Sequence, residues 1–171
     1  REFSYHLLDL FPDLANRNFQ SRFDAFPWRE DAVAFRAWTK GQTGYPIVDA
    51  GMRELWRTGW MHNRVRMIVA MFLTKNLLID WRRGERFFMN QLVDGDFPSN
   101  NGGWQWAAST GCDAQPWFRI FNPITQSLRF DPQGKFIKKY VPELDKFSED
   151  EIHSPWLSQN NNKINYPKPI V

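Results

Sequence analysis

The sequence predicts an all-α fold, and two features of its apolar pattern support this prediction. Apolar side chains recur at spacings of three and four residues, most clearly in the series Val65, Ile68, Val69, Phe72 and Leu73, which would form one face of a helix. Prolines and glycines fall between such segments, where they would begin or end helices. With 171 residues, 42% of them hydrophobic, the chain can bury one sizeable core. We therefore expect one helical domain over residues 1–171.

The first third of the chain should hold three helices, each bounded by a residue that starts or stops a helix. The expected helices are residues 1–11 before Pro12, a short helix capped by Glu30 or Asp31 that runs to residue 37 or 38 before Gly41, and residues 46–58 between Pro46 and Gly59. Residues 13–30 follow neither the period of a helix nor that of a strand. We expect them to form an ordered loop held down by aromatic side chains.

The rest of the chain continues the helical pattern. The longest helix should open at Trp60, and further helices should cover residues 85–93 and 131–140. Asn122 is biased away from the helical conformation by the proline that follows it, in a short rigid connection. We expect Thr125, Gln126 and Arg129 to follow in a polar turn. We expect residues 143–171 to form an irregular tail that wraps the domain, because prolines gather around this segment.

Residues 94–106 combine side chains that few structural needs explain together. The segment reads Asp-Gly-Asp-Phe-Pro-Ser-Asn-Asn-Gly-Gly-Trp-Gln-Trp. A glycine inside a helix costs about 1 kcal/mol relative to alanine, so the Gly-Gly pair is best explained by close approach of something flat or bulky to the backbone. Trp104 and Trp106 would point about 200° apart on a helix and meet different surroundings. A core turn with a glycine kink is the alternative, but the combination favours a ligand site.

A second candidate segment is the start of the helix that follows residue 60. Asn63, Arg66 and Met67 share one face by their spacing, whereas Arg64 points elsewhere. A guanidinium is suited to phosphate or carboxylate. From this segment alone, a solvated helix face explains the two arginines equally well.

Composition excludes several classes of protein. The single Cys112 rules out an intramolecular disulfide and, with only three histidines, gives no metal-ligand spacing, so we expect no metal site. No apolar stretch approaches the roughly 18 residues of a membrane span, so we expect a soluble protein in the cytosol. The net charge of +3 supports nucleic-acid binding no better than ordinary solubility. The nine tryptophans exceed the usual needs of a core and are typical of stacking sites.

Four motifs follow one another in the chain. They are Thr-Gly-Tyr-Pro-Ile-Val-Asp-Ala at 43–50, Trp-Met-His-Asn-Arg-Val-Arg-Met at 60–67, the segment 94–106, and Arg-Ile-Phe-Asn-Pro at 119–123. In this order they resemble the photolyase/cryptochrome family, and most closely its class I cyclobutane pyrimidine dimer DNA photolyases. The resemblance covers nearly the whole chain. It implies the C-terminal part of an all-helical domain that binds FAD and repairs ultraviolet-damaged DNA with blue light.

The resemblance also implies that parts of the protein are absent from this chain. The chain opens at Arg1 in what reads as the middle of a helix, so we interpret it as a fragment. The clamp on the FAD phosphates, a glutamate and a tryptophan that contact the dimer, and an N-terminal α/β domain with an antenna chromophore (methenyltetrahydrofolate or deazaflavin) would lie upstream. The fragment alone is then expected to repair nothing.

The family's cofactor contacts can be carried over position by position. Asn100 would hydrogen-bond the flavin nitrogen that gains a proton on reduction, and Asp94 would pair with Arg66 beside the ring. Further cofactor contacts are expected from Asp96, Asn63, Trp60 and Arg1. Trp104, Trp81 and Trp28 match the electron-hopping chain that leads from the flavin to the surface, although ordinary packing would also explain the last two.

The resemblance assigns a second group of residues to DNA. Trp106 matches the indole that stacks on a dimer flipped out of the duplex, and Met67 would lie near that dimer. Contacts to the dimer or its flanking DNA are expected from Arg64, Asn63, Gln126 and Arg129. A base–aromatic stack is worth about 1 to 3 kcal/mol, comparable to the few kcal/mol that flipping costs. We expect a protein of bacterial type that acts as a monomer on chromosomal DNA.

Three other functions compete with this one. A cryptochrome would share the fold without repair activity, but Asn100, Met67 and the Trp-Gln-Trp run favour repair. A (6-4) photolyase would be expected to carry His near Asn63 and a different sequence after Trp104. A helical nucleic-acid-binding module without flavin would leave the Asn-Asn-Gly-Gly run unexplained.

Overall fold

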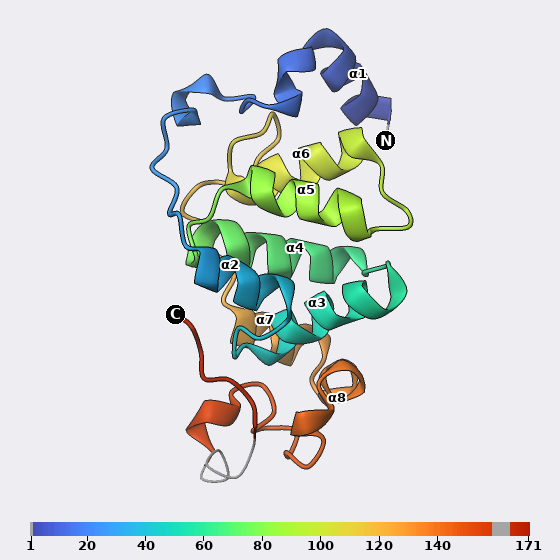
Figure 1. Cartoon of the computed structure of the whole chain (residues 1–171), viewed down its shortest axis with the longest axis vertical. Coiled ribbons are helices and arrows are strands. Elements are labelled where there is room, and N and C mark those ends of the chain that lie inside the picture. Colours follow the sequence, from blue (N-terminus) through green and yellow to red (C-terminus); the bar gives the residue numbers. More distant parts are fainter. Residues whose placement is uncertain (1, 159–164) are drawn as a thin grey trace.

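Helices are stacked one above another along the long axis of the molecule (Figure 1). This computed structural model describes residues 2–158 and 165–171, so the predicted role of Arg1 falls outside the described residues. The α-helices of this part are α1 (Glu2–Leu10), α2 (Ala32–Thr39), α3 (Pro46–Thr58), α4 (Asn63–Met71), α5 (Trp81–Gln91), α6 (Phe97–Ala108), α7 (Pro123–Phe130) and α8 (Lys135–Tyr140). The described residues form no β-strand, which confirms the all-α prediction.

Short helices of other types connect these elements. Four are 3₁₀ helices: η1 (Pro12–Ala15), η2 (Ser21–Phe23), η4 (Pro142–Leu144) and η5 (Pro155–Leu157). The fifth, η3 (Phe72–Asn76), is a π turn that continues α4. None of the described helices is both long and apolar enough to cross a membrane.

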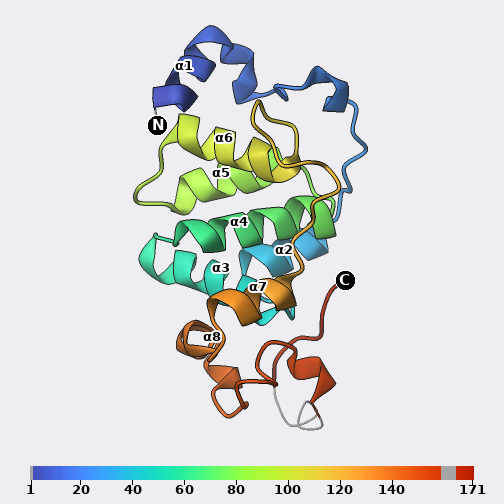
Figure 2. The same ribbon diagram turned by 180° about the vertical axis from the view of Figure 1, so that it is seen from behind.

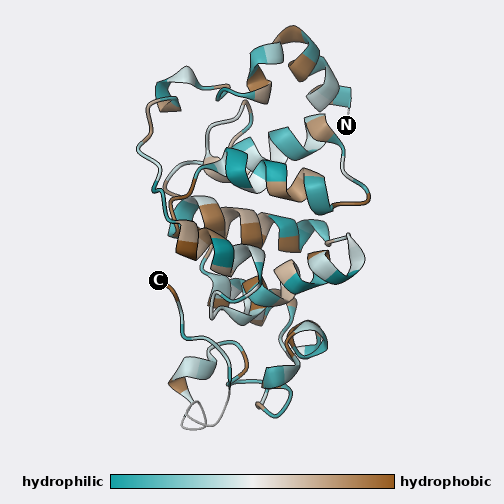
Figure 3. Cartoon of the chain, in the orientation of Figure 1, coloured by the Kyte–Doolittle hydropathy of each residue, from teal (hydrophilic) through white to brown (hydrophobic). Residues whose placement is uncertain are grey.

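The layer order places α4 at the centre. From α1 at one end the stack passes through α6 and α5 to α4 and α2, then to α3 and α7, and ends at α8 and the C-terminal segment (Figures 1 and 2). Apolar residues gather on α4 in the middle of this stack (Figure 3). Val65, Ile68, Val69 and Phe72 are all buried there, as the spacing in the sequence predicts.

The start of α4 differs from the prediction. The helix begins at Asn63 rather than Trp60, because the extended His62 caps it and accepts a hydrogen bond at Nδ1 from the backbone N–H of Arg64 (3.1 Å). The α-helical pattern ends at Met71, where the π turn begins. The longest α-helix of the described residues is therefore α3, with 13 residues, and not this one. Both ends of α3, at Pro46 and before the left-handed Gly59, agree with the prediction.

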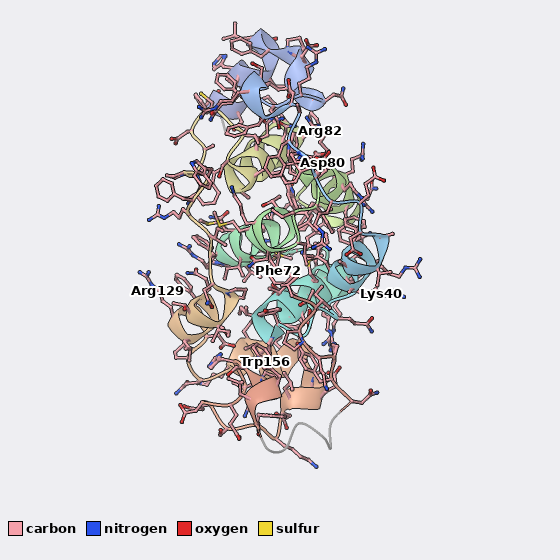
Figure 4. The ribbon with its side chains drawn as sticks, turned by 90° about the vertical axis from the view of Figure 1, so that its left-hand side faces the viewer. Lys40, Phe72, Asp80, Arg82, Arg129 and Trp156 are labelled. Atoms are coloured by element: carbon pink, nitrogen blue, oxygen red, sulfur yellow. The ribbon has the colours of Figure 1, made fainter. Side chains whose placement is uncertain are left out.

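Two polar caps explain other errors in the predicted boundaries. Asp80 accepts a hydrogen bond from the N–H of Arg82 (2.9 Å), so α5 starts at Trp81, four residues before the predicted helix. The guanidinium of Arg82 returns to the Asp80 carboxylate, and Figure 4 shows the two side chains at the start of α5. Asn122 caps α7 by accepting from two backbone N–H groups. The predicted polar turn with Thr125, Gln126 and Arg129 is therefore wrong, because these residues lie on α7.

The last helix is shorter than predicted, and the tail is tied back to the core. Gly134 adopts a left-handed conformation with φ of +64°, which delays the start of α8 to Lys135. In the tail, the Tyr166 hydroxyl donates to the buried Asp49 carboxylate (2.5 Å), and the N–H of Ile170 donates to the carbonyl of Thr43 (3.1 Å). These contacts hold the C-terminal residues beside the start of α3, about halfway along the stack (Figure 1).

Candidate functional site

A cavity of about 360 Å³ lies between α4, α5 and α6, and we call it the α4–α6 pocket. Its size falls at the lower end of the range for ligand sites, about 300 to 1,000 Å³. Eight of the residues singled out in the sequence line it: Asn63, Arg66, Met67, Asp94, Asp96, Asn100, Trp104 and Trp106. The remaining lining residues include Phe88, Leu92, Ser99 and Gly103. The pocket therefore combines polar groups and aromatic walls.

Arg66 and Asp94 form an ion pair at the edge of this pocket. Nη2 of Arg66 lies 2.9 and 2.8 Å from the two carboxylate oxygens of Asp94, and Nε donates to the carbonyl of Met61 (2.7 Å). The two side chains are 27% and 46% exposed, so the pair is not buried. Solvent screening limits such a pair to about 1 kcal/mol of stability at most. Its main effect is to fix the guanidinium and the carboxylate beside the cavity.

The orientation of the Asn100 amide is set by Glu85. Nδ2 of Asn100 lies 3.1 Å from the backbone carbonyl of Glu85 and 3.1 Å from its Oε1. A backbone carbonyl can only accept, so the atom of Asn100 that faces it must be the donating nitrogen. The other amide atom, Oδ1, is then the acceptor that Asn100 offers to a ligand in the pocket.

Glu85 is a buried carboxyl that the sequence analysis did not single out. Burial raises the pKa of this carboxyl above its usual value, while the hydrogen bond from Asn100 and the charge of Arg86 act in the opposite direction. Glu85 is only 4% exposed, so its carboxyl group is shielded from solvent. No local sequence pattern links Glu85 to Asn100, which lies 15 residues later on a different helix.

Helix α6 presents a smooth backbone to the pocket. Asp96 caps it, accepting a hydrogen bond from the N–H of Ser99 (3.1 Å) and another from the hydroxyl of Tyr5 on α1. A Cβ built on Gly103 would meet no atom within 4 Å, and one built on Gly102 would meet only Ser4 Oγ at 3.7 Å. The protein's own packing therefore requires neither glycine. The open space at Gly103 fits a ligand that lies flat against α6.

The two tryptophans of α6 have different surroundings, as the helical spacing predicts. Trp104 is buried, with its ring 5.0 Å from Phe88 and 6.0 Å from Trp38 between centroids. Its indole fills the space beside Gly84, where an added Cβ would lie only 2.2 Å from the ring. Trp106 is half-buried and lines the α4–α6 pocket.

A second cavity, of about 500 Å³, adjoins the first, and we call it the arginine cavity. Met67 lines both cavities. The walls of the arginine cavity carry three guanidiniums, from Arg64, Arg119 and Arg129, and no carboxylate comes from the described residues that line it. Arg129 projects outward from α7 in Figure 4. Such a charge distribution suits an anionic ligand.

One residue of the arginine cavity, Arg119, was not predicted from the sequence as a site residue. Arg119 belongs to the Arg-Ile-Phe-Asn-Pro motif; in the structure it lines the arginine cavity and donates to Gln115 Oε1 (3.3 Å). Gln126, which was predicted, lines the same cavity, and its Oε1 is buried without a hydrogen-bond partner.

Other predicted residues lie away from the α4–α6 pocket. Trp60 is 45% exposed on the turn before α4, in edge contact with His62, and is not among the lining residues. Trp81 is buried and donates from its indole to Asn18 Oδ1 (2.8 Å), whereas Trp28 lies half-buried against Phe26. Trp38, which was not singled out, is the tryptophan in ring contact with Trp104.

Comparisons with known proteins agree on one family. The family model described as the FAD binding domain of DNA photolyase matches residues 1–171. A deoxyribodipyrimidine photo-lyase of Vibrio cholerae is 56% identical over 172 residues, and one of Escherichia coli is 54% identical over 174 residues; each match covers 100% of this chain and 37% of the relative. This chain therefore spans little more than a third of the length of these relatives.

Solved structures give the same result. A bacterial class III photolyase from Agrobacterium tumefaciens superposes with a TM-score of 0.96 at 55% identity, over 100% of this chain and 37% of that one. A cryptochrome from Synechocystis superposes with a TM-score of 0.92 at 44% identity, again over 100% and 37%. The fold is thus that of proteins titled photolyase and cryptochrome.

Proposed function

This chain belongs to the family of the FAD binding domain of DNA photolyase, and from that premise we propose that it forms the flavin-binding and lesion-binding part of a light-driven DNA repair enzyme. The substrate would be a cyclobutane pyrimidine dimer in ultraviolet-damaged DNA. The observation that carries the proposal is the junction of two cavities: a pocket with a flat glycine wall opens beside a cavity lined by arginines, and Met67 borders both.

The residues of the α4–α6 pocket fit a flavin ring. Gly103 leaves room for a flat ring system against α6, and Phe88 and Trp104 supply aromatic walls. The polar groups would then hold the ring edge: Asn100 through the Oδ1 that Glu85 leaves as an acceptor, and Arg66 with Asp94 through donor and acceptor atoms fixed by their pairing. FAD, when bound and reduced, supplies a light-excited electron that splits the cyclobutane ring and then returns.

The protein itself then needs no acid, base or nucleophile for the bond cleavage. Asn100 would accept a hydrogen bond from a protonated ring nitrogen, and this contact would favour the reduced form of the cofactor. Asp96 orders the first turn of α6 and so fixes the position of Asn100 on that helix. The antenna chromophore would be held by a part of the protein outside this chain.

The arginine cavity and Trp106 would bind the DNA. Arg64, Arg119 and Arg129 are free of acidic partners within that cavity, so they can contact phosphates. Phosphate contacts provide affinity without sequence preference, and binding should weaken as salt is added. The half-buried indole of Trp106 would stack on the flipped dimer, with Asn63 and Met67 beside it.

An electron supply to the oxidised cofactor is the remaining part of the proposal. Trp104 borders the pocket, and we propose Trp81 and Trp28 as the next members of a path to the surface. Buried indoles suit this role because they are readily oxidised. The ring contact between Trp104 and Trp38 offers a neighbour at 6.0 Å that this path does not use.

The subclass stays a prediction. The sequence motifs resemble class I enzymes, whereas a structure at 55% identity is titled a class III photolyase. A cryptochrome photoreceptor without repair activity is the alternative, since a protein titled cryptochrome shares this fold at 44% identity. Action as a monomer and a cytoplasmic location also stay predictions.

Substitution of Trp106 tests the lesion-binding role. In the intact protein, Trp106→Ala should weaken binding to dimer-containing DNA by about tenfold, in line with the 1 to 3 kcal/mol of a base stack, and should leave binding to undamaged DNA nearly unchanged. The matched control is Trp56→Ala, which removes an exposed indole that lines neither cavity. An equal loss for damaged and undamaged DNA, or the same loss in the control, would refute the stacking role.

A further inference from the structure

A third cavity, of about 260 Å³, lies on the side of the molecule where the loop before α2 meets the end of the π turn. We call it the Trp28 cavity. Its apolar walls include Phe23, Phe26 and Ile120, with Trp28 beside Phe26 at 4.5 Å between ring centroids. The cavity shares no lining residue with the α4–α6 pocket. It is large enough for one aromatic ring with a polar substituent.

Two polar atoms at this cavity are buried without a partner. The indole Nε1 of Trp28 and the hydroxyl Oγ1 of Thr110 are both shielded from solvent, and neither has a hydrogen-bond partner. Thr110 as a whole is only 2% exposed. A buried donor that lacks a partner is costly, and most such groups in folded proteins are paired. Both residues line the cavity, so an acceptor placed there could satisfy them.

A cation at the same cavity lacks a counter-ion. The ammonium of Lys75 donates to Ser109 Oγ (2.7 Å) and to the carbonyl of Trp117 (3.3 Å), and both of these acceptors are neutral. Burial lowers the pKa of this ammonium. None of the described residues that line the cavity is acidic. Lys75 therefore keeps one donor and its positive charge available to a ligand.

The backbone around the cavity is irregular in a way that is common at ligand sites. Leu78 and Ser109 both line it, and they are the two non-glycine residues of the described chain with positive φ, at 55° and 66°. Ser109 ends α6 in this conformation, whereas Leu78 follows the π turn that carries Lys75. Strained residues and π turns concentrate at functional sites, because the remaining structure must hold them in place.

We propose that the Trp28 cavity is a binding site for a small aromatic carboxylate. The ring would lie between Phe23, Phe26 and Ile120, and the carboxylate would accept hydrogen bonds from Trp28, Thr110 and Lys75. This assignment gives each unpartnered donor an acceptor and gives the cation its counter-ion. The site lies in a different cavity from the α4–α6 pocket and needs neither flavin nor DNA, and it shares Trp28 with the proposed electron path.

The test uses benzoate as the probe on the intact protein labelled with ¹⁵N in its tryptophans. Trp28→Phe identifies the indole N–H signal of Trp28. Benzoate added at constant ionic strength should shift this signal in a saturable way. The affinity for benzamide, its neutral analogue, should be lower by about tenfold or more. Absence of a saturable shift, or equal affinity for the two probes, would overturn the proposal.

Charge-removing variants give a second test. Lys75→Met should lower the affinity for benzoate by about tenfold or more and leave the affinity for benzamide unchanged. The matched control is Lys40→Met, which removes an exposed lysine at the end of α2 that does not line the Trp28 cavity. Thr110→Val keeps the side-chain shape and should weaken benzoate a few-fold, so it serves if the Lys75 variant does not fold. An equal loss in the Lys40 variant, or no loss in the Thr110 variant, would contradict the site.

Discussion

Replacement of Gly103 by alanine should have opposite effects on the empty protein and on cofactor binding. Gly103 lies in the interior of α6, and a Cβ there would meet no protein atom within 4 Å. Alanine is favoured over glycine in a helix by about 1 kcal/mol, and nothing in the protein opposes this gain. Without cofactor, we therefore expect Gly103→Ala to stabilise α6.

The same methyl group should interfere with the flavin. If the open space at Gly103 is occupied by the ring, an added methyl group causes overpacking, which costs about 1 to 3 kcal/mol in a tightly packed site. This range corresponds to a rise of about 5-fold to 150-fold in the dissociation constant for FAD. The stability gain and the affinity loss thus arise from one atom, and they differ only in whether the ligand is present.

Hydrogen exchange and flavin titration measure the two effects. In the apoprotein, a gain of about 1 kcal/mol should slow amide exchange in α6 by about fivefold. Gly102→Ala is the matched control: it should give the same slowing, because its Cβ makes an ordinary 3.7 Å contact with Ser4, but Gly102 does not line the α4–α6 pocket and its FAD affinity should stay unchanged. Unchanged FAD affinity in Gly103→Ala would refute the placement of the flavin against α6.

Two further predictions concern buried groups. Burial raises the pKa of the Glu85 carboxyl, so between the unfolded and the folded pKa the folded state binds more protons than the unfolded state, and the free energy of unfolding should fall as pH rises through this window. Glu85→Gln should remove part of this dependence of the unfolding free energy on pH, as measured by urea unfolding at several pH values. An unchanged dependence would contradict the prediction. Part of the dependence should remain, because burial also raises the pKa of Asp49. Gly84→Ala would bring a Cβ to 2.2 Å from Trp104, so we expect a loss of about 1 to 3 kcal/mol of unfolding free energy in thermal or urea unfolding; wild-type stability would show that the indole can move aside.

Regular features of the fold could be predicted from the sequence because they depend on neighbouring residues. The ends of α3 follow from Pro46 and Gly59, whose backbone preferences act locally. The cap of α2 is Asp31, one of the two residues expected there. The start of α4 was mispredicted because histidine is an unusual cap, and His62 acts through Nδ1. The turn predicted after Asn122 was wrong because Pro123 disfavours the helical conformation only in the residue before it and can itself begin a helix, with Asn122 as the cap.

The site was predictable to the extent that its residues belong to short motifs. Asn100, Trp104 and Trp106 belong to the segment 94–106, whose unusual composition favoured a ligand site, and all three line the α4–α6 pocket. Glu85 could not be found this way, since it meets Asn100 only after α5 and α6 pack together. The same holds for the Trp28 cavity, whose donors come from three separate segments.

The measurement that tests the central proposal most directly is photorepair by the intact protein reconstituted with reduced FAD. An oligonucleotide that contains a cyclobutane thymine dimer would be illuminated with blue light, and the recovery of thymine absorbance would be followed. We expect recovery that requires both light and FAD. Flavin photochemistry without recovery would contradict the repair function and favour a photoreceptor with the same fold.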